Sequence, residues 1–207
     1  AMSSVPSQLW QTLSKYLFPN NTYHFNSGGE PDCIPDLSYE ELLAFYKTHY
    51  HPSNAIFMTY GDIPAEEHQA RFEEQVLHRF ERLDTVISVA PATRFNAPIT
   101  VEEAYPLTEE GELSDKSHVV LGWLLGQSTN LDESLKAHLL GSILLDNSAS
   151  PLQKALETSK LGTAPSPLCG LDDSQLELIF ICGLEGSNPE QANDIEAMIF
   201  EVIKDVA

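Results

Sequence analysis

The sequence predicts an α+β fold made of two-layer units, in which antiparallel-rich sheets are packed by helices. Three observations support this prediction. Continuous apolar runs at 55–60, 119–125 and 176–184 are typical of buried strands. Between these runs, apolar residues recur at helical spacing behind capping signals. Finally, an apolar run followed by glycine, proline, an acidic first turn and a helix occurs twice, beginning at Ala55 and at Leu176, which favours a duplicated unit.

Local signals predict helices in six places. Ser38 and Glu41 form a capping box, and Pro52 ends the helix that they begin. Pro64 begins the next helix, with two glutamates in its first turn, where acidic side chains suit the helix dipole. The expected helices cover roughly 5–18, 38–51, 64–83, 132–145, 150–161 and 188–206.

Two more strands are expected beside the three apolar runs. The pattern at 99–107 predicts an edge strand, which should pair antiparallel with 119–125. A short strand should precede the turn at 170–174, and the acidic stretch 108–116 should be a loop.

The chain divides where this periodicity fades. Between Asp84 and Asn96 there is neither a helical nor a strand pattern, and two prolines bracket the stretch. We therefore expect 1–83 and 97–207 to form separate α+β units joined by a linker at 84–96. The amphipathic pattern close to Ala1 suggests that the chain begins within a longer protein and is a fragment of it.

Charge limits the classes of partner. The 207 residues include 31 acidic and 11 basic side chains, which gives a formal net charge of -20. Nucleic acid is disfavoured because phosphate contacts need basic patches. Cationic partners such as basic peptides are favoured, although solubility alone also explains an acidic surface. No apolar run approaches the roughly 20 residues of a membrane span, and the start lacks a signal-peptide pattern, so no membrane partner is expected.

The cysteines give no metal or redox motif. Cys33, Cys169 and Cys182 are widely spaced and include no C-x-x-C pair, so neither a zinc ribbon nor a thioredoxin-type site is supported. Free thiols fit a reducing compartment. We expect the cytoplasm, with an organelle matrix as the alternative.

Two groups of histidines are candidate zinc ligands. His49 and His51 lie near a helix end without a third ligand at a motif spacing, so we expect capping and packing. The run from Pro64 to His68 matches the second half of the zinc motif H-x-x-E-H, but proline stands where the first histidine is needed. We therefore expect no metal ligand and no catalytic residue in this chain.

The turn at Asn26, Ser27, Gly28 and Gly29 is the remaining candidate site. No helix follows these glycines directly, as a phosphate-binding loop would require. A tight turn is the simpler interpretation, since glycine adopts positive φ readily. The alternative is a loop at the border of a substrate cleft.

Longer strings carry a family resemblance. S-G-G-E-P at 27–31, I-P-D-L-S-Y-E-E-L at 34–42, T-H-Y-H-P-S-N-A at 48–55 and Y-G-D at 60–62 resemble the insulinase-like zinc metallopeptidases. The chain is most similar to their presequence-protease branch. The similarity is densest over 1–83, and it implies the α+β unit that this family repeats.

The resemblance also implies a function. It implies a zinc-dependent endopeptidase that degrades short unstructured peptides in an enclosed chamber, with the zinc ligands upstream of Ala1. On this interpretation, 1–83 closes the catalytic-type domain, 97–207 begins a second similar domain, and the partners are peptide substrates and the remaining domains. Asn26 to Gly29 would border the substrate cleft. A non-catalytic peptide-binding or assembly subunit of the same fold is the alternative.

Overall fold

A computed structural model describes residues 4–84, 87–107 and 114–207. Contacts divide the chain into two compact units, one containing the residues up to Ser27 and from Ala90 onward, the other Gly28–Val89. This division differs from the predicted boundaries at 83 and 97, because the residues before Ser27 pack with the C-terminal part of the chain. Contacts within this chain do not say to which domain of a longer protein each part belongs. The assignment of 1–83 and 97–207 to two family domains therefore stays a prediction.

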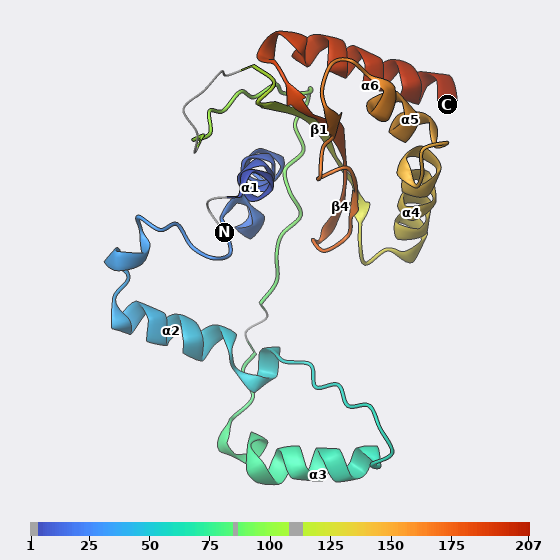
Figure 1. The fold of residues 1–207 in the computed structure, drawn as a ribbon. Helices are drawn as coiled ribbons and strands as arrows, with labels where there is room; N and C mark the ends of the chain where they lie inside the picture. The colour runs from blue at the N-terminus through green and yellow to red at the C-terminus, as the bar shows by residue number, and fades with distance from the viewer. Residues whose placement is uncertain (1–3, 85–86, 108–113) are drawn as a thin grey trace. The chain divides into compact units, whose positions relative to one another are not determined.

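The first unit is a four-stranded antiparallel sheet with helices on both faces (Figure 1). The strands are β1 (Ser117–Gln127), β2 (Ala164–Pro165), β3 (Gly170–Asp172) and β4 (Glu177–Ser187), and β4 pairs with each of the others. The helical elements are α1 (Val5–Leu17), η1 (Thr22–His24), α4 (Leu131–Leu145), α5 (Pro151–Thr158), η5 (Pro189–Gln191) and α6 (Ala192–Val206). Together these elements confirm the predicted α+β fold class.

Alternation along β4 produces two cores. Phe180, Cys182 and Leu184 point to the face that α4, α5 and α6 cover, where they pack with Ile195 and Ile199. The alternate residues Ile179 and Ile181 point to the opposite face, where Phe18 and the apolar side of α1 cover them. Because both faces are covered, nearly the whole of β4 is buried, as the continuous apolar run predicted.

The predicted pairing of 99–107 with 119–125 is wrong. Residues 99–107 form no strand, and β1 pairs instead with β4, with Leu121 opposite Cys182. Because β4 is apolar on both faces, it can be buried only in the centre of the sheet, and it therefore takes the place beside β1.

The second unit is helical and extended among its described residues. Its elements are η2 (Ile34–Asp36), α2 (Tyr39–His49), η3 (Pro52–Asn54), α3 (Ala65–Gln75) and η4 (Leu77–Arg79). The predicted capping box is confirmed, since the Ser38 hydroxyl accepts from the Glu41 amide and the Glu41 carboxylate accepts from the Ser38 amide at 2.9 Å. The helix predicted over 64–83 ends at Gln75 and continues only as the short η4.

The predicted buried strand at 55–60 is wrong. These residues are extended, but they pair with no strand in the described part of the chain, and Ile56 and Met58 are 97% and 93% exposed. A strand exists only by pairing with a neighbour, because its amides and carbonyls need partners outside the segment. The apolar run is suited to burial, and the described residues of 28–89 provide no sheet for it.

His118 on β1 is expected to make the stability of the first unit depend on pH. Its Nδ1 is buried and has no hydrogen-bond partner among the described residues. Burial lowers the pKa of His118 below its ordinary value, and the nearby Glu185 raises it in part. A folded-state pKa below the unfolded one means that the unfolded chain binds more protons between the two values.

We therefore expect the free energy of unfolding to be greatest above a pH of about 6.5 and to fall as the pH drops through that value. Urea titrations across this window should show it, and His118→Phe should flatten the dependence. His78→Phe, on an exposed histidine, is the matched control. Hydrogen bonds lower the pKa values of Glu41 and Glu103. These two carboxyls therefore change the free energy of unfolding only below a pH of about 4.5, outside this window. An unchanged pH dependence in His118→Phe would contradict the assignment.

Candidate functional site

The candidate loop is a turn that requires one of its glycines. Ser27 and Gly28 form the turn, and Gly29 follows with φ of +83°, which a side chain rarely adopts. A Cβ on Gly29 would also lie 3.3 Å from the Ile34 side chain. The predicted tight turn is therefore confirmed. Asn26 and Ser27 belong to the first compact unit, and Gly28 and Gly29 belong to the second. That the loop borders a substrate cleft stays a prediction.

His49 and His51 act as helix caps. His49 Nδ1 lies 3.0 Å from the Phe45 carbonyl oxygen one turn earlier, and its ring stacks on the Phe45 ring. His51 Nδ1 accepts the Ser53 amide hydrogen at 3.2 Å at the start of η3. The predicted capping of the helix C-terminus is confirmed for His49, whereas His51 caps the N-terminus of the following η3 instead.

The run from Pro64 to His68 is the exposed start of α3. Pro64 precedes the first turn, Glu67 forms an ion pair with Arg71 at 2.5 Å, and the His68 ring stacks against Phe72. Glu67 is therefore engaged with a cation in its own helix. Within 4–84, 87–107 and 114–207, no group of three or more His, Cys, Asp and Glu side chains could hold a metal ion. The residues present do not fit a zinc site.

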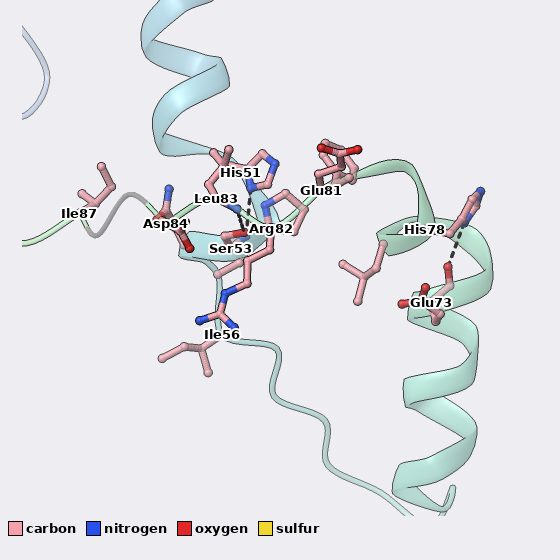
Figure 2. Close-up of a pocket in the computed structure, with 15 residues that line it drawn as sticks. His51, Ser53, Ile56, Glu73, His78, Glu81, Arg82, Leu83, Asp84 and Ile87 are labelled. Carbon is pink, nitrogen blue, oxygen red and sulfur yellow. Dashed lines mark hydrogen bonds between the residues drawn. The ribbon is translucent and has the colours of Figure 1, made fainter.

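An open pocket lies near η3 and η4 of the second unit (Figure 2). It collects several polar groups, but their bonds are to backbone. The Ser53 hydroxyl accepts from the Leu83 amide at 3.0 Å, and His78 Nδ1 lies 2.9 Å from the Glu73 carbonyl oxygen. Since neither histidine in the pocket is bonded to the Ser53 hydroxyl, the arrangement lacks an activated nucleophile. Its polar groups hold the turns together.

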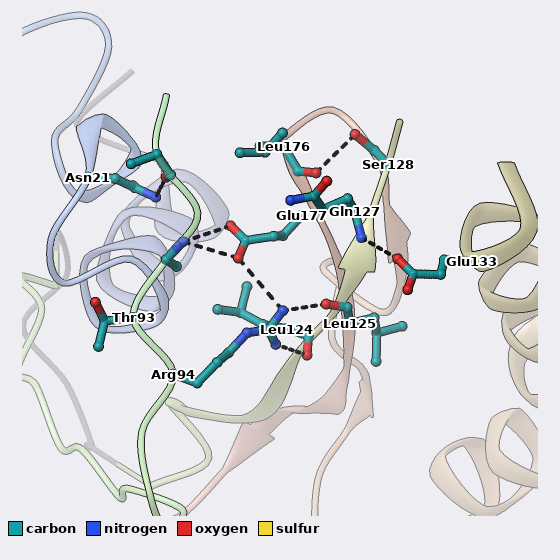
Figure 3. Close-up of polar contacts among 12 residues, drawn as sticks. Asn21, Thr93, Arg94, Leu124, Leu125, Gln127, Ser128, Glu133, Leu176 and Glu177 are labelled. Carbon is teal, nitrogen blue, oxygen red and sulfur yellow. Dashed lines mark hydrogen bonds and ion pairs between the residues drawn. The ribbon is translucent and has the colours of Figure 1, made fainter. Parts of the chain in front are cut away.

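Glu177, at the start of β4, is a buried acidic side chain with several polar contacts (Figure 3). Its side chain is 3% exposed, and both carboxylate oxygens accept from the Ala92 amide, at 3.1 and 3.2 Å. Arg94 lies 3.7 Å from the same carboxylate and donates to the carbonyls of Leu124 and Leu125 on β1. Glu177 and Arg94 thus fasten the 90–94 segment to the sheet.

We call the contacts of Glu177 with Ala92 and Arg94 the Glu177 clamp. The sequence pattern did not predict it, since Glu177 lies within the run 176–184 that was predicted only as a buried strand. Asn20 strengthens the clamp, since its side chain exchanges two hydrogen bonds with Thr93. With its acceptors bonded to backbone and its side chain closed off from solvent, Glu177 is placed to hold structure. It is not placed to transfer a proton.

The three thiols differ in exposure, and this predicts their reactivity. Cys33 is exposed, whereas Cys169 is partly buried and Cys182 is fully buried. Burial raises the pKa of both Cys169 and Cys182, so little thiolate forms at neutral pH. A disulfide-based thiol reagent should therefore modify Cys33 rapidly in the native protein and the other two only after denaturation. Cys33→Ser should remove the fast phase, and two rapidly reacting thiols in wild type would contradict the prediction.

The described helices include none that is both long and apolar enough to cross a bilayer. The described residues of the first unit form an α+β fold. The family profile of the "Peptidase M16 inactive domain" matches residues 36–207. The chain therefore belongs to the M16 peptidase family, and the insulinase-like resemblance is confirmed.

Named relatives extend over nearly the whole chain. The mitochondrial presequence protease of Xenopus tropicalis is 40% identical over 200 residues, which are 95% of this chain and 19% of the relative. Presequence protease 1, chloroplastic/mitochondrial, of Arabidopsis thaliana is 35% identical over 96% of this chain and 18% of the relative. Protein HypA of Clostridium perfringens is 28% identical over 100% of this chain and 21% of its own length. The chain thus spans about a fifth of the length of these relatives.

Proposed function

We propose that this chain is part of a zinc-dependent endopeptidase that degrades short unstructured peptides in an enclosed chamber. Its own residues would serve as scaffold and chamber wall. The observation that carries the proposal is the membership in the M16 peptidase family together with relatives named presequence proteases. Zinc would be held by residues outside this chain, because the described residues offer no ligand set.

The proposal is tested with two proteins, this chain and the polypeptide as it occurs in its source. We expect the chain alone to bind no stoichiometric zinc and to leave a fluorogenic peptide intact. The source polypeptide should cleave that peptide, should carry zinc, and should lose activity when a chelator removes the metal. Chelator-sensitive cleavage by the chain alone would overturn the assignment of this stretch to scaffold.

A non-catalytic peptide-binding or assembly subunit is the second candidate. The description of the matching profile as an inactive domain favours it. In that case the source polypeptide would bind peptides or partner proteins without zinc and without cleaving them. Metal analysis and a cleavage assay on the same preparation separate the two candidates.

The names of the relatives support a proposal for the compartment. Several are named mitochondrial or chloroplastic, which supports the organelle matrix over the cytoplasm that the sequence alone suggested. Fractionation of the source cells, with detection of the native protein, tests this placement.

The turn at Asn26–Gly29 is proposed to border the cleft through which peptides pass. Replacing Gly29 by Val in the source polypeptide should lower stability, because valine is strained at φ of +83°. If the loop also meets substrate, kcat/KM per folded molecule should fall further. Gly61→Val is the matched control, since Gly61 has φ of +147° and open space around it.

Melting temperature and kcat/KM are measured on both variants. Equal activity per folded molecule in Gly29→Val and wild type would leave the loop as scaffold only.

A further inference from the structure

Two of the three cysteines meet across the sheet. Gly170, the first residue of β3, lies opposite Ile181 of β4, and in an antiparallel pair each step along one strand is a step back along the other. One step before Gly170 in this register, Cys169 comes opposite Cys182. Residues opposite one another in antiparallel strands direct their side chains to the same face of the sheet. The register therefore places both thiols on one face.

The contacts of the two side chains agree with this register. The Cys169 thiol donates at 3.5 Å to the carbonyl oxygen of Gly183, the residue that follows Cys182. Cys182 belongs to the core between the sheet and helices α4, α5 and α6, and Cys169 packs against the same core. Burial raises the pKa of Cys182, and the charge of a Cys169 thiolate raises it further, as two neighbouring thiols require.

The spacing of such a pair suits a disulfide. Opposite residues of antiparallel strands have Cα atoms about 4.5–5.5 Å apart, which is within the range of about 4.4–6.8 Å that a disulfide spans. Their Cβ atoms must approach by about 1 Å. Gly170 can supply this movement, because glycine is conformationally permissive and no atom of the described residues lies within 4 Å of the place that its Cβ would occupy.

Access to solvent decides which chemistry the pair can perform. Cys182 is fully buried, whereas Cys169 is partly exposed. A small dissolved oxidant therefore meets Cys169 first, and Cys182 is the thiol beside it. A metal site would need further ligands, and 4–84, 87–107 and 114–207 hold no group of three or more His, Cys, Asp and Glu side chains suited to one.

We propose that Cys169 and Cys182 are a redox-sensitive pair, which a peroxide oxidises to a reversible disulfide within the folded sheet. Cys169 loses its thiol proton and attacks one oxygen of hydrogen peroxide, whose O–O bond breaks. The products of this step are a sulfenic acid on Cys169 and one water. The Cys182 sulfur then displaces the sulfenic hydroxyl, which leaves with the Cys182 proton as a second water. The two sulfurs lose two electrons, and the peroxide gains them.

The disulfide fastens the start of β3 to β4, and a dithiol reductant restores both thiols by exchange. Among the described strands β3 pairs with β4 alone, so this cross-link holds an edge of the sheet. The inference goes beyond the proposed function and does not depend on it, because the pair lies in the sheet of this chain whether or not the intact protein cleaves peptides.

The test maps disulfides in the source polypeptide. The protein is treated in dilute solution with hydrogen peroxide, its remaining thiols are alkylated, and it is digested without reduction at aspartates. Asp172 and Asp173 lie between Cys169 and Cys182, so digestion separates the two cysteines unless a disulfide joins them. Mass spectrometry should find the joined peptides after oxidation and should lose them after dithiothreitol.

The rates of oxidation add a second criterion. Because burial raises the pKa of Cys169, the cross-link should form more slowly than Cys33 is oxidised. If Cys169 and Cys182 are both still reduced when Cys33 has reached its sulfonic acid, the proposal is wrong. A disulfide from Cys33 to either of them as the main product would also overturn it, since the sheet register then does not select the pair.

Cys33→Ser is the matched control, because it removes the exposed thiol and should leave the cross-link unchanged. Cys169→Ser should prevent the cross-link and leave Cys182 reduced. Cys182→Ala, with a small apolar side chain in the buried position, should leave a sulfenic acid on Cys169 that dimedone traps. Circular dichroism checks the fold of each variant. The decisive map is made on the wild-type protein, so a variant that fails to fold does not remove the test.

Hydrogen exchange tests whether the disulfide fastens β3. Closing the loop 169–182 reduces the freedom of the opened chain, so the amides of β3 should exchange at least about tenfold more slowly after oxidation. The effect should disappear after dithiothreitol and should be absent in Cys169→Ser. Unchanged exchange in the cross-linked wild-type protein would show that the disulfide does not hold this edge, which would overturn the structural role proposed for it.

Discussion

Gly183→Ala is expected to destabilise the first unit strongly. Gly183 lies on β4 opposite Val120 of β1, in the pair that forms the centre of the sheet. A Cβ at this position would lie 2.0 Å from the Val119 carbonyl oxygen and 2.7 Å from the Val120 Cα. Both are backbone atoms of the paired strand, so neither can rotate away. Overpacking typically costs about 1–3 kcal/mol, and rigid neighbours place this change at or above the upper end.

Gly126→Ala is the matched control for this prediction. Gly126 is on β1, and a Cβ there would meet the Glu133 side chain. That carboxylate is the end of a flexible side chain and can move, although it would lose its bond from the Gln127 amide at 2.8 Å. The Glu133 Cβ, at 2.9 Å, would also have to shift slightly. Circular dichroism and thermal unfolding should show a large loss for Gly183→Ala and a small loss for Gly126→Ala. Similar melting temperatures for Gly183→Ala and wild type would show that β1 and β4 are not paired in this register.

The sequence predicted the elements of the first unit better than their neighbours in space. The runs at 119–125 and 176–184 lie within β1 and β4, and the predicted helices at 132–145 and 150–161 correspond closely to α4 and α5. These predictions depend on local periodicity and capping, which are signals within a few neighbouring residues. Strand pairing depends instead on residues far apart in the sequence, and local patterns do not distinguish 99–107 from 176–184 as the neighbour of 119–125.

The strand prediction at 55–60 shows a second limit of sequence patterns. Ile56, Met58 and Tyr60 are apolar as a buried strand requires, yet all three are strongly exposed. The apolar pattern shows that the segment is suited to burial against other apolar residues. It does not show which segment, if any, covers it. Helix α4 shows the same limit. Leu135, Leu139 and Ile143 were predicted as part of a helix, and only the structure shows that their side chains are exposed.

The candidate site was predictable only where local geometry decides. The helix-cap role of His49 follows from its position at a helix end, and the turn at Gly29 follows from its glycines. His51 instead begins the next short helix. The clamp at Glu177 could not be found in this way, because Ala92 and Arg94 lie more than eighty residues away along the chain. A buried acid inside an apolar run is the one signal that could have pointed to it, since such a group needs partners.

Removing that acid is expected to have the second large effect. In Glu177→Ala, the buried Ala92 amide loses its acceptor, Arg94 loses its carboxylate, and a small cavity remains. An unsatisfied buried amide costs about 1–3 kcal/mol, and the lost side chain adds to it. Arg94 is about half exposed, so solvent offsets part of its loss. We expect a total of about 3 kcal/mol, or a fall in melting temperature of roughly 6–12 °C for a chain of this size.

Two further variants separate the clamp from simple loss of volume. Glu177→Gln keeps the shape and one oxygen acceptor, so it should lose less than Glu177→Ala. The double variant Glu177→Ala with Arg94→Ala should lose less than the sum of the two single changes, because the pair acts together. Hydrogen exchange at the Ala92 amide should accelerate in Glu177→Ala, since the segment 90–94 is then released from the sheet. Additive losses with slow exchange at Ala92 would show that packing, and not the clamp, holds this segment in place.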